Sequence, residues 1–218
     1  MAPSSTSDDS TKKSHDPPSE PPAAKKPKPD NLDAPNKPAT MGGAHEQADK
    51  NHTEDDFPDV MPYNNDFDKM DEKFNGSCHC QSVQFKCKAD PESSICCHCS
   101  TCQVVHGASS QRALIFKKEN LAFTNESLKH LAFYQTHDKK VGRHLPCKVR
   151  CKTCGTLIAD EGRNMYLMFP ALFHFPDSKE PNEWAPTDHI FYSQRCLDIV
   201  RKDGVTFWSG AKGKSDEC

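Results

Sequence analysis

The sequence predicts a mainly β domain of short strands that is held together by clustered cysteines and preceded by a long disordered tail. Beyond the first sixty or so residues, apolar side chains recur at every second position or in short continuous runs. Such runs predict strands, and no segment has the period of a long amphipathic helix. The 218 residues also contain twelve cysteines, seven of which fall into three tight groups.

The first 62 residues have almost no large apolar side chains and are rich in acidic residues and proline. Ordering such a segment costs backbone entropy without burying apolar surface. We therefore expect a disordered tail over residues 1–62, a folded domain over 63–210 and a polar C-terminal tail over 211–218. Within the first tail, Lys25-Lys26-Pro27-Lys28 has the form of a nuclear-localisation cluster, although a solvated linker is the simpler explanation.

Composition also indicates the cellular setting. A net charge of -3 gives no electrostatic reason to expect nucleic acid or an anionic membrane as a partner. The N-terminus lacks the apolar core of a signal peptide, and the longest apolar run, residues 165–173, is too short to span a bilayer. We expect an intracellular, cytoplasmic protein, or a nuclear one if the stretch Lys25 to Lys28 is a localisation signal. The sequence leaves the oligomeric state open.

Strands are expected wherever the alternation is clear. Val83, Phe85 and Cys87 alternate with polar residues, which predicts a half-buried strand with Cys87 inside the core. The polar, proline-bearing stretch 176–186 indicates a surface excursion between two strands, with Trp184 inside it. Further strands are expected over residues 113–116, 131–135, 156–159, 166–169 and 189–193.

Two outer groups of cysteines have the spacing of zinc ligands. Cys151 and Cys154 stand three apart before a glycine, as in a zinc knuckle, where the glycine permits the turn. The side chains of Cys78 and Cys80 lie on the same face of an extended segment, and at a turn they can converge on one ion. Clustered thiols in a reducing compartment are metal ligands far more often than disulfides. Together the two pairs predict a closed structural site of four cysteines.

The central group then keeps three thiols, Cys97, Cys99 and Cys102. A zinc ion with three protein ligands has an open position for water or substrate, which suggests a catalytic site. Two alternatives stay open: Cys96 or Cys147 closes this site and makes it structural, or the thiols are metal-free redox sensors. His79, His98 and His106 lie beside these cysteines and are left out of the ligand set, because such histidines often lie outside it.

These three motifs closely resemble the glutathione-dependent formaldehyde-activating enzyme family, also called the centromere protein V/GFA domain. The resemblance extends over roughly residues 70–210, with further similar segments at residues 160–165, 189–192 and 208–210. It implies a mainly β, Mss4-like zinc-stapled fold with two Zn²⁺ per chain. By this resemblance Cys78, Cys80, Cys151 and Cys154 hold the structural zinc, and Cys97, Cys99 and Cys102 hold the catalytic zinc.

The resemblance also implies an activity. The family joins glutathione and formaldehyde in S-hydroxymethylglutathione, so we expect a carbon-sulfur lyase-type enzyme whose partners are glutathione or another small thiol and an aldehyde. The alternative is a non-catalytic zinc-binding module associated with chromatin. Gln103 departs from the basic side chain that we expect after Cys102. An anionic tripeptide needs cationic partners, and the candidates are Arg112, Arg143, Arg150 and Arg163.

Overall fold

The computed structural model describes residues 59–218. Most of the predicted disordered tail, including the lysine cluster at residues 25–28, lies outside the described residues. The described part is mainly β, as expected. Its two α-helices and five 3₁₀ helices are short: α1 (Ser100–His106), α2 (Asn125–Leu128), η1 (Lys118–Asn120), η2 (Pro170–Leu172), η3 (Pro176–Ser178), η4 (Asn182–Trp184) and η5 (Tyr192–Gln194).

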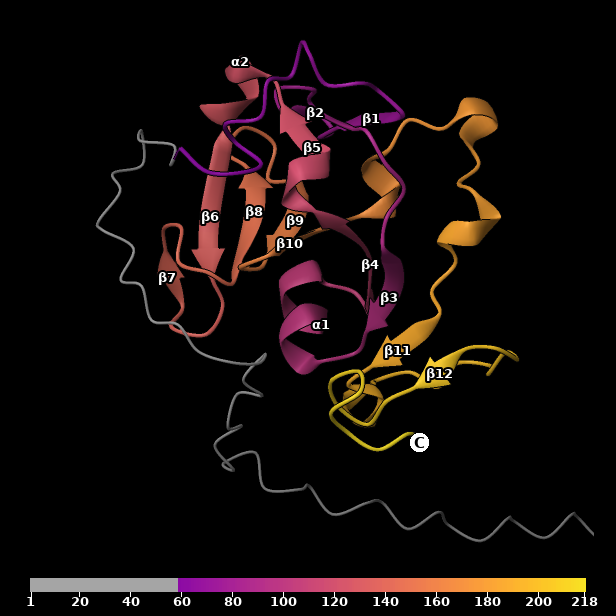
Figure 1. Ribbon diagram of the computed structural model, residues 1–218. Coiled ribbons are helices and arrows are strands. Elements are labelled where there is room, and N and C mark those ends of the chain that lie inside the picture. The colour runs from indigo at the N-terminus through magenta and orange to yellow at the C-terminus, as the bar shows by residue number, and fades with distance from the viewer. Residues whose placement is uncertain (1–58) are drawn as a thin grey trace, which may run out of the picture. The chain divides into compact units, whose positions relative to one another are not determined.

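Twelve strands make up two sheets (Figure 1). The smaller sheet has the order β1-β2-β5 and the larger one the order β12-β11-β3-β4-β10-β9-β8-β6-β7. β11 runs parallel to β3 and β12, and the other pairs are antiparallel. The strands are β1 (Phe74–Ser77), β2 (Gln84–Cys87), β3 (Ser93–Cys97), β4 (Gln111–Lys117), β5 (Leu121–Phe123), β6 (Leu131–Gln135), β7 (Lys140–Val141), β8 (Cys147–Cys151), β9 (Leu157–Glu161), β10 (Met165–Met168), β11 (Asp188–Ile190) and β12 (Thr206–Phe207).

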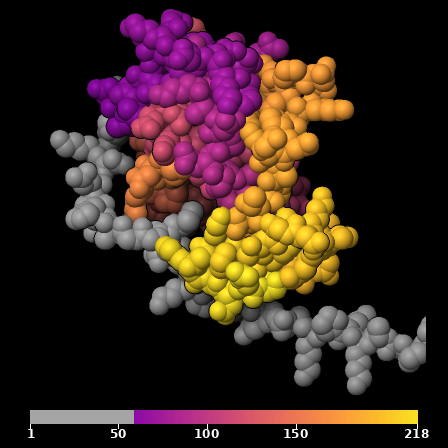
Figure 2. Space-filling view, turned by 45° about the vertical axis from the view of Figure 1, so that its right-hand side comes forward, coloured from indigo at the N-terminus to yellow at the C-terminus, as the bar shows by residue number. Residues whose placement is uncertain are grey.

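The strand expected over residues 189–193 is wrong beyond Ile190. Phe191 has a φ of 53°, in the left-handed region that bulky residues rarely adopt, and the short helix η5 follows it. The Phe191 N–H donates a 2.8 Å hydrogen bond to the carbonyl of Gly210. The chain therefore turns away from the sheet there, and Figure 2 shows the C-terminal residues gathered at one end of the described part.

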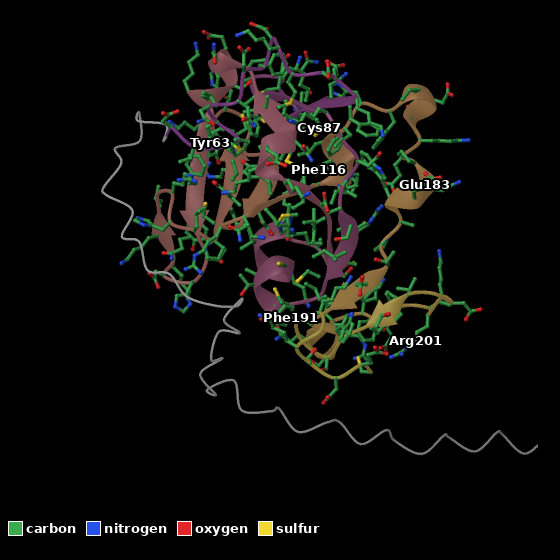
Figure 3. All side chains as sticks on the ribbon, in the orientation of Figure 1. Tyr63, Cys87, Phe116, Glu183, Phe191 and Arg201 are labelled. Carbon is green, nitrogen blue, oxygen red and sulfur yellow. The ribbon has the colours of Figure 1, made fainter. Side chains whose placement is uncertain are left out.

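The main core lies between the two sheets and is rich in aromatic side chains. Cys87 is fully buried in it, as predicted, and so is Phe116; Figure 3 shows both well away from Phe191 and Arg201 of the C-terminal segment. Trp184, inside the expected surface excursion, is 2% exposed and contacts the Phe173 ring. The excursion between β10 and β11 is therefore tied to the core by an aromatic side chain.

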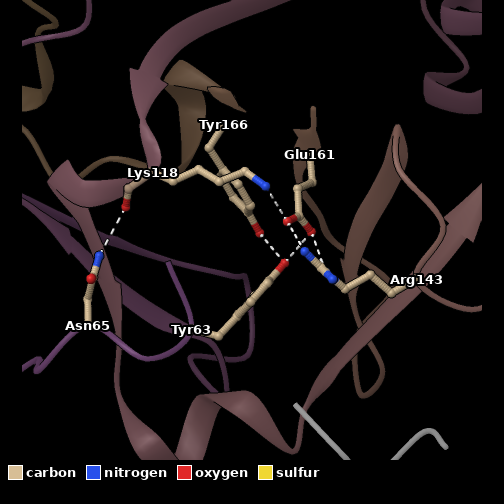
Figure 4. Close-up of polar contacts among 6 residues, drawn as sticks. All are labelled: Tyr63, Asn65, Lys118, Arg143, Glu161 and Tyr166. Atoms are coloured by element: carbon tan, nitrogen blue, oxygen red, sulfur yellow. Dashed lines mark hydrogen bonds and ion pairs between the residues drawn. The ribbon is translucent and has the colours of Figure 1, made fainter. Parts of the chain in front are cut away.

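One buried polar network crosses this core (Figure 4). The Glu161 carboxylate is fully buried and accepts hydrogen bonds from Tyr63 Oη at 2.6 Å, from Lys118 Nζ at 2.7 Å and from Arg143 Nη2 at 2.6 Å. Tyr63 Oη also lies 3.2 Å from Tyr166 Oη. The positive charges of Lys118 and Arg143 offset the free-energy cost of burying the Glu161 carboxylate.

In the described part of the chain no helix is long and apolar enough to cross a membrane.

Candidate metal centres

The two outer cysteine pairs meet at one place. Candidate ligand atoms of Cys78, Cys80, Cys151 and Cys154 all lie within 4.8 Å of one another. The Sγ atoms of Cys78 and Cys80 are 3.5 Å apart, and those of Cys80 and Cys151 are 3.8 Å apart. Tetrahedral zinc with bonds of about 2.3 Å holds its sulfur atoms about 3.8 Å apart. This four-thiol cluster could therefore hold a metal ion, as the spacing predicted.

Local structure affects these thiols differently, because burial raises the pKa of Cys78 to about 12 whereas the pKa of Cys154 is lowered. The Val83 N–H donates to Cys78 Sγ at 3.3 Å, and Gly155 adopts a φ of 75°, which its lack of a β-carbon permits. Burial would raise the pKa of Cys154, but hydrogen bonds from Thr156 lower it to about 5. A thiol with so low a pKa is present as the thiolate that zinc binds.

The central cysteines form a second cluster, in which candidate ligand atoms of Cys97, Cys99 and Cys102 lie within 4.8 Å of one another. Cys97 ends β3, Cys99 is the N-cap of α1, and Cys102 lies in its first turn. The Cys102 N–H donates to Cys99 Sγ at 3.3 Å. Hydrogen bonds from Cys102 and Cys97 lower the pKa of the Cys99 thiol far below its ordinary value.

Neither alternative fourth thiol joins this three-thiol cluster. Cys96 groups instead with His98 and His189, and Cys147 belongs to none of the three clusters found among residues 59–218. Cys147 is buried. Desolvation and the nearby Glu161 charge raise the pKa of the Cys147 thiol. Three protein thiols at the second cluster leave room for a fourth ligand, and the assignment of all seven cysteines as zinc ligands stays a prediction.

A buried cation lies against the three-thiol cluster. Lys148 of β8 is 5% exposed, and its Nζ lies 3.8 Å from Cys102 Sγ. The same Nζ donates to Asp160 at 2.8 Å and to Gln111 at 3.1 Å. Burial alone would lower its pKa, but the Asp160 carboxylate and the thiols of Cys102 and Cys99 raise it above the ordinary value. Lys148 is therefore positively charged, and no motif in the sequence singled it out.

A pocket of about 810 Å³ is lined by two residues that contact this cation, although neither Lys148 nor the three cysteines line it. His106 and Gln111 line it, and both contact Lys148; His106 Nε2 is 3.2 Å from Lys148 Nζ. Burial and the Lys148 charge lower the pKa of His106, so its ring is neutral. The volume lies within the usual range for small-molecule sites, about 300–1,000 Å³.

Of the four candidate arginines, Arg112 lines this pocket. Its guanidinium donates to both carboxylate oxygens of Glu180, at 2.8 and 3.1 Å. Arg143 belongs to the Glu161 network, and Arg163 lines a different pocket. The Gln103 amide is already used within the protein, because it donates to the carbonyls of His98 and Gln194.

A third cluster was not predicted from the sequence. Cys96, His98 and His189 are all buried, and candidate ligand atoms of the three lie within 4.8 Å of one another. The signal available in the sequence was the alternation of Cys96 and His98 on one face of an extended segment. The third member is 91 residues beyond His98, and pairing of β11 with β3 brings it there.

The chain was compared with known proteins. The family model described as glutathione-dependent formaldehyde-activating enzyme matches residues 73–194, more than half of the chain. A crystal structure of a Rhodobacter sphaeroides protein, a Northeast Structural Genomics target, is similar at 18% identity, covering 53% of this chain and 98% of that chain with a TM-score of 0.38. A search of curated proteins found no match.

Proposed function

Because the chain belongs to the glutathione-dependent formaldehyde-activating enzyme family, we propose that it is a zinc-dependent carbon-sulfur lyase that forms or cleaves the adduct of glutathione with formaldehyde. The observation that carries this proposal is the three-thiol cluster of Cys97, Cys99 and Cys102 beside the buried cation of Lys148. Three thiols leave one ligand position for a substrate, and the neighbouring pocket gives it a place to bind.

The donor set fits zinc at both cysteine clusters. Four thiols with sulfur separations of 3.5 and 3.8 Å match a closed structural site, and three thiols match an open one. We propose two Zn²⁺ ions per chain at these clusters. The ion held by Cys97, Cys99 and Cys102 would supply Lewis acidity and favour the deprotonated form of a bound thiol.

The reaction forms a bond between the glutathione sulfur and the formaldehyde carbon. The C=O π electrons move to the oxygen, and the proton lost by the thiol ends on that oxygen, which yields the hydroxymethyl group. His106 is a neutral titratable side chain that lines the pocket beside Lys148. The Lys148 ammonium can only donate, so it occupies the Nε2 lone pair of this neutral ring, and we propose that the proton reaches the oxygen through solvent in the pocket.

Lys148 has an electrostatic part in this scheme. Three thiolates around one divalent ion leave a net negative charge, and a substrate thiolate adds another. The buried ammonium of Lys148 offsets part of that charge from 3.8 Å, in surroundings where charge interactions are stronger than in water. Asp160 and Gln111 fix the position of the ammonium, so it does not have to reorganise when the substrate thiol loses its proton.

Arg112 is the best-placed partner for a glutathione carboxylate. It already holds the Glu180 carboxylate in a bidentate pair, and both side chains are about one-third exposed. A substrate carboxylate has the same shape and charge and can replace Glu180 on the guanidinium. This exchange would anchor the tripeptide at the pocket, on the face of β4 that Arg112 shares with its register partner Cys96.

The test follows exchange of labelled formaldehyde with glutathione, with zinc content measured in the same sample. We expect exchange faster than in buffer, loss of that acceleration in Cys99→Ser, and a drop of one zinc per chain in the same variant. Cys218→Ser, at the exposed C-terminus, is the matched control and should change neither value. Exchange no faster than in buffer would favour the non-catalytic zinc module, and unchanged zinc in Cys99→Ser would remove the second site.

A further inference from the structure

The cluster of Cys96, His98 and His189 has no part in the proposed reaction. Side chains alternate along extended backbone, so Cys96 and His98 lie on the face opposite to Cys97. His189 is the parallel register partner of Cys96, and the His98 N–H donates to the carbonyl of Ile190 at 2.9 Å. Backbone pairing of β3 with β11 therefore sets the three side chains together from two segments far apart in the chain.

We propose that Cys96, His98 and His189 form a third metal site, which takes Zn²⁺. The set offers one thiolate and two imidazoles, which are the side chains that bind zinc in closed protein sites. Its members are 4%, 1% and 8% exposed, so water does not compete strongly for the same position. Candidate ligand atoms of all three lie within 4.8 Å of one another.

The two rings are joined through their nitrogens. His98 Nε2 lies 2.8 Å from His189 Nδ1, so one of these nitrogens must donate to the other. If His98 Nε2 donates, then His98 Nδ1 is a bare lone pair; if His189 Nδ1 donates, then His98 Nδ1 carries a hydrogen. In both tautomers His98 Nδ1 is buried without a hydrogen-bond partner among the described residues. An ion between His98 Nε2 and His189 Nδ1 would replace this hydrogen bond by two metal bonds, and His98 Nδ1 would then carry the hydrogen.

The distances are close to those that zinc requires. With Zn–N bonds of about 2.0–2.1 Å, two nitrogens of a tetrahedral site are about 3.3 Å apart. The 2.8 Å separation would therefore open by roughly half an ångström on binding, a shift within the reach of small ring rotations. The Tyr192 and Phe207 rings enclose the pair, with centroids 5.1 Å from His98 and 4.6 Å from His189 respectively. Near Cys96 lie the Ser110 hydroxyl and the Arg112 guanidinium, and the three side chains leave the fourth position of a tetrahedral ion to a further ligand.

Such an ion would connect the C-terminal segment to the chain between the catalytic thiols. His98 stands between Cys97 and Cys99, and His189 precedes the turn at Phe191, which Figure 3 shows in the C-terminal segment. The stretch Cys96 to Cys99 would then bind one ion through Cys97 and Cys99 and another through Cys96 and His98. The third site would fix the backbone that positions the three-thiol cluster.

Native mass spectrometry of the full chain, expressed with added Zn²⁺ and freed of loosely bound metal, tests the proposal. We expect three zinc ions in the unmodified chain and two in both Cys96→Ser and His189→Gln. Cys87→Ser and His174→Gln are matched controls, because Cys87 lies in β2 of the small sheet and belongs to no cluster, and His174 is exposed and bonded to Asn75 and Ser77. Both controls should keep three ions. Cys96→Ser and His189→Gln chains that keep the same zinc content as the unmodified protein would overturn the proposal.

The outcome is separable from the fate of the proposed enzyme. If Cys99→Ser changes nothing while Cys96→Ser still loses one ion, the third site stands and the catalytic zinc fails. If the cluster variants do not fold, zinc X-ray absorption of the unmodified chain decides, since the other two clusters offer only sulfur from the protein. Imidazole scattering in that spectrum supports the third site, and its absence overturns it.

Discussion

Lys148 Nζ lies 3.8 Å from Cys102 Sγ, and the lysine side chain is buried in the sheet. We expect Lys148→Met to lower kcat/KM for formaldehyde exchange roughly 10-fold to 100-fold, because a charge-assisted contact contributes about 1.5–3 kcal/mol. Lys148→Arg keeps the charge and should recover part of the loss. Initial rates and zinc content of each variant provide the measurement.

The control for this change is Lys152→Met, since Lys152 is an exposed lysine just beyond the same strand. It should leave both the rate and the zinc content unchanged. A Lys148→Met chain with full activity and full zinc would contradict the electrostatic part that we propose for this lysine. Loss of zinc together with activity would instead indicate that the ammonium is needed to hold the thiolates together.

The two predicted zinc clusters should respond differently to loss of a thiol. Cys151 is fully buried and its Sγ lies 3.8 Å from that of Cys80, so Cys151→Ala opens the cluster that joins β8 to the β1-β2 hairpin. Structural zinc contributes directly to folding free energy, and we expect this variant to unfold or to lose its cooperative thermal transition. Cys99→Ser should keep that transition. Thermal unfolding followed by circular dichroism, with and without a chelator, measures both, and a normally folded Cys151→Ala chain would remove the structural assignment.

Local patterns in the sequence were enough for the class of the fold and for several strands. The run at residues 131–135 coincides with β6, and the alternation around Phe85 coincides with β2. Burial does not alternate along either strand, however, and Lys86 of β2 is buried as well. Cysteine spacing likewise predicted the two thiol clusters, since ligands that share one ion must lie within a few ångströms. These are short-range constraints that a sequence displays directly.

Contacts that depend on pairing between distant segments could not be predicted from the sequence. Lys148 lies in β8, where Cys147, Val149 and Cys151 alternate with Lys148 and Arg150. That alternation would place Lys148 on the polar side of a strand, whereas the fold buries its side chain beside Cys102. His189 reaches Cys96 by the same kind of pairing. The strand expected up to residue 193 failed because a hydrophobic Phe191 takes a left-handed conformation that its type does not signal.

The buried carboxylate of Glu161 makes Tyr63 important for stability. Burial, Tyr166 and the Glu161 charge raise the pKa of Tyr63 well above 10, so its hydroxyl stays protonated and donates. Tyr63→Phe leaves one carboxylate oxygen with a donor fewer, and we expect a loss of about 1–3 kcal/mol in the free energy of unfolding. Tyr134→Phe on β6 is the control, because no hydrogen bond joins its hydroxyl to another residue in the 59–218 range. Urea denaturation compares the two, and equal stabilities would contradict this account of the network.

Gly76 is the point at which the small sheet approaches the chain after β10 most closely. A β-carbon at this position would overlap the Leu172 carbonyl oxygen and the Phe85 ring, and the residue forms an isolated β-bridge with Phe173. We expect Gly76→Ala to lower the free energy of unfolding by about 1–3 kcal/mol, as overpacking in a core does. The strain also falls two residues before Cys78, so zinc retention at the four-thiol cluster in mild urea should decrease as well. Gly210→Ala meets only the Ser215 side chain, at 3.2 Å, which can move aside, and it should cost less. If both variants unfold at the same urea concentration as the unmodified chain, the close approach at Gly76 does not constrain the fold.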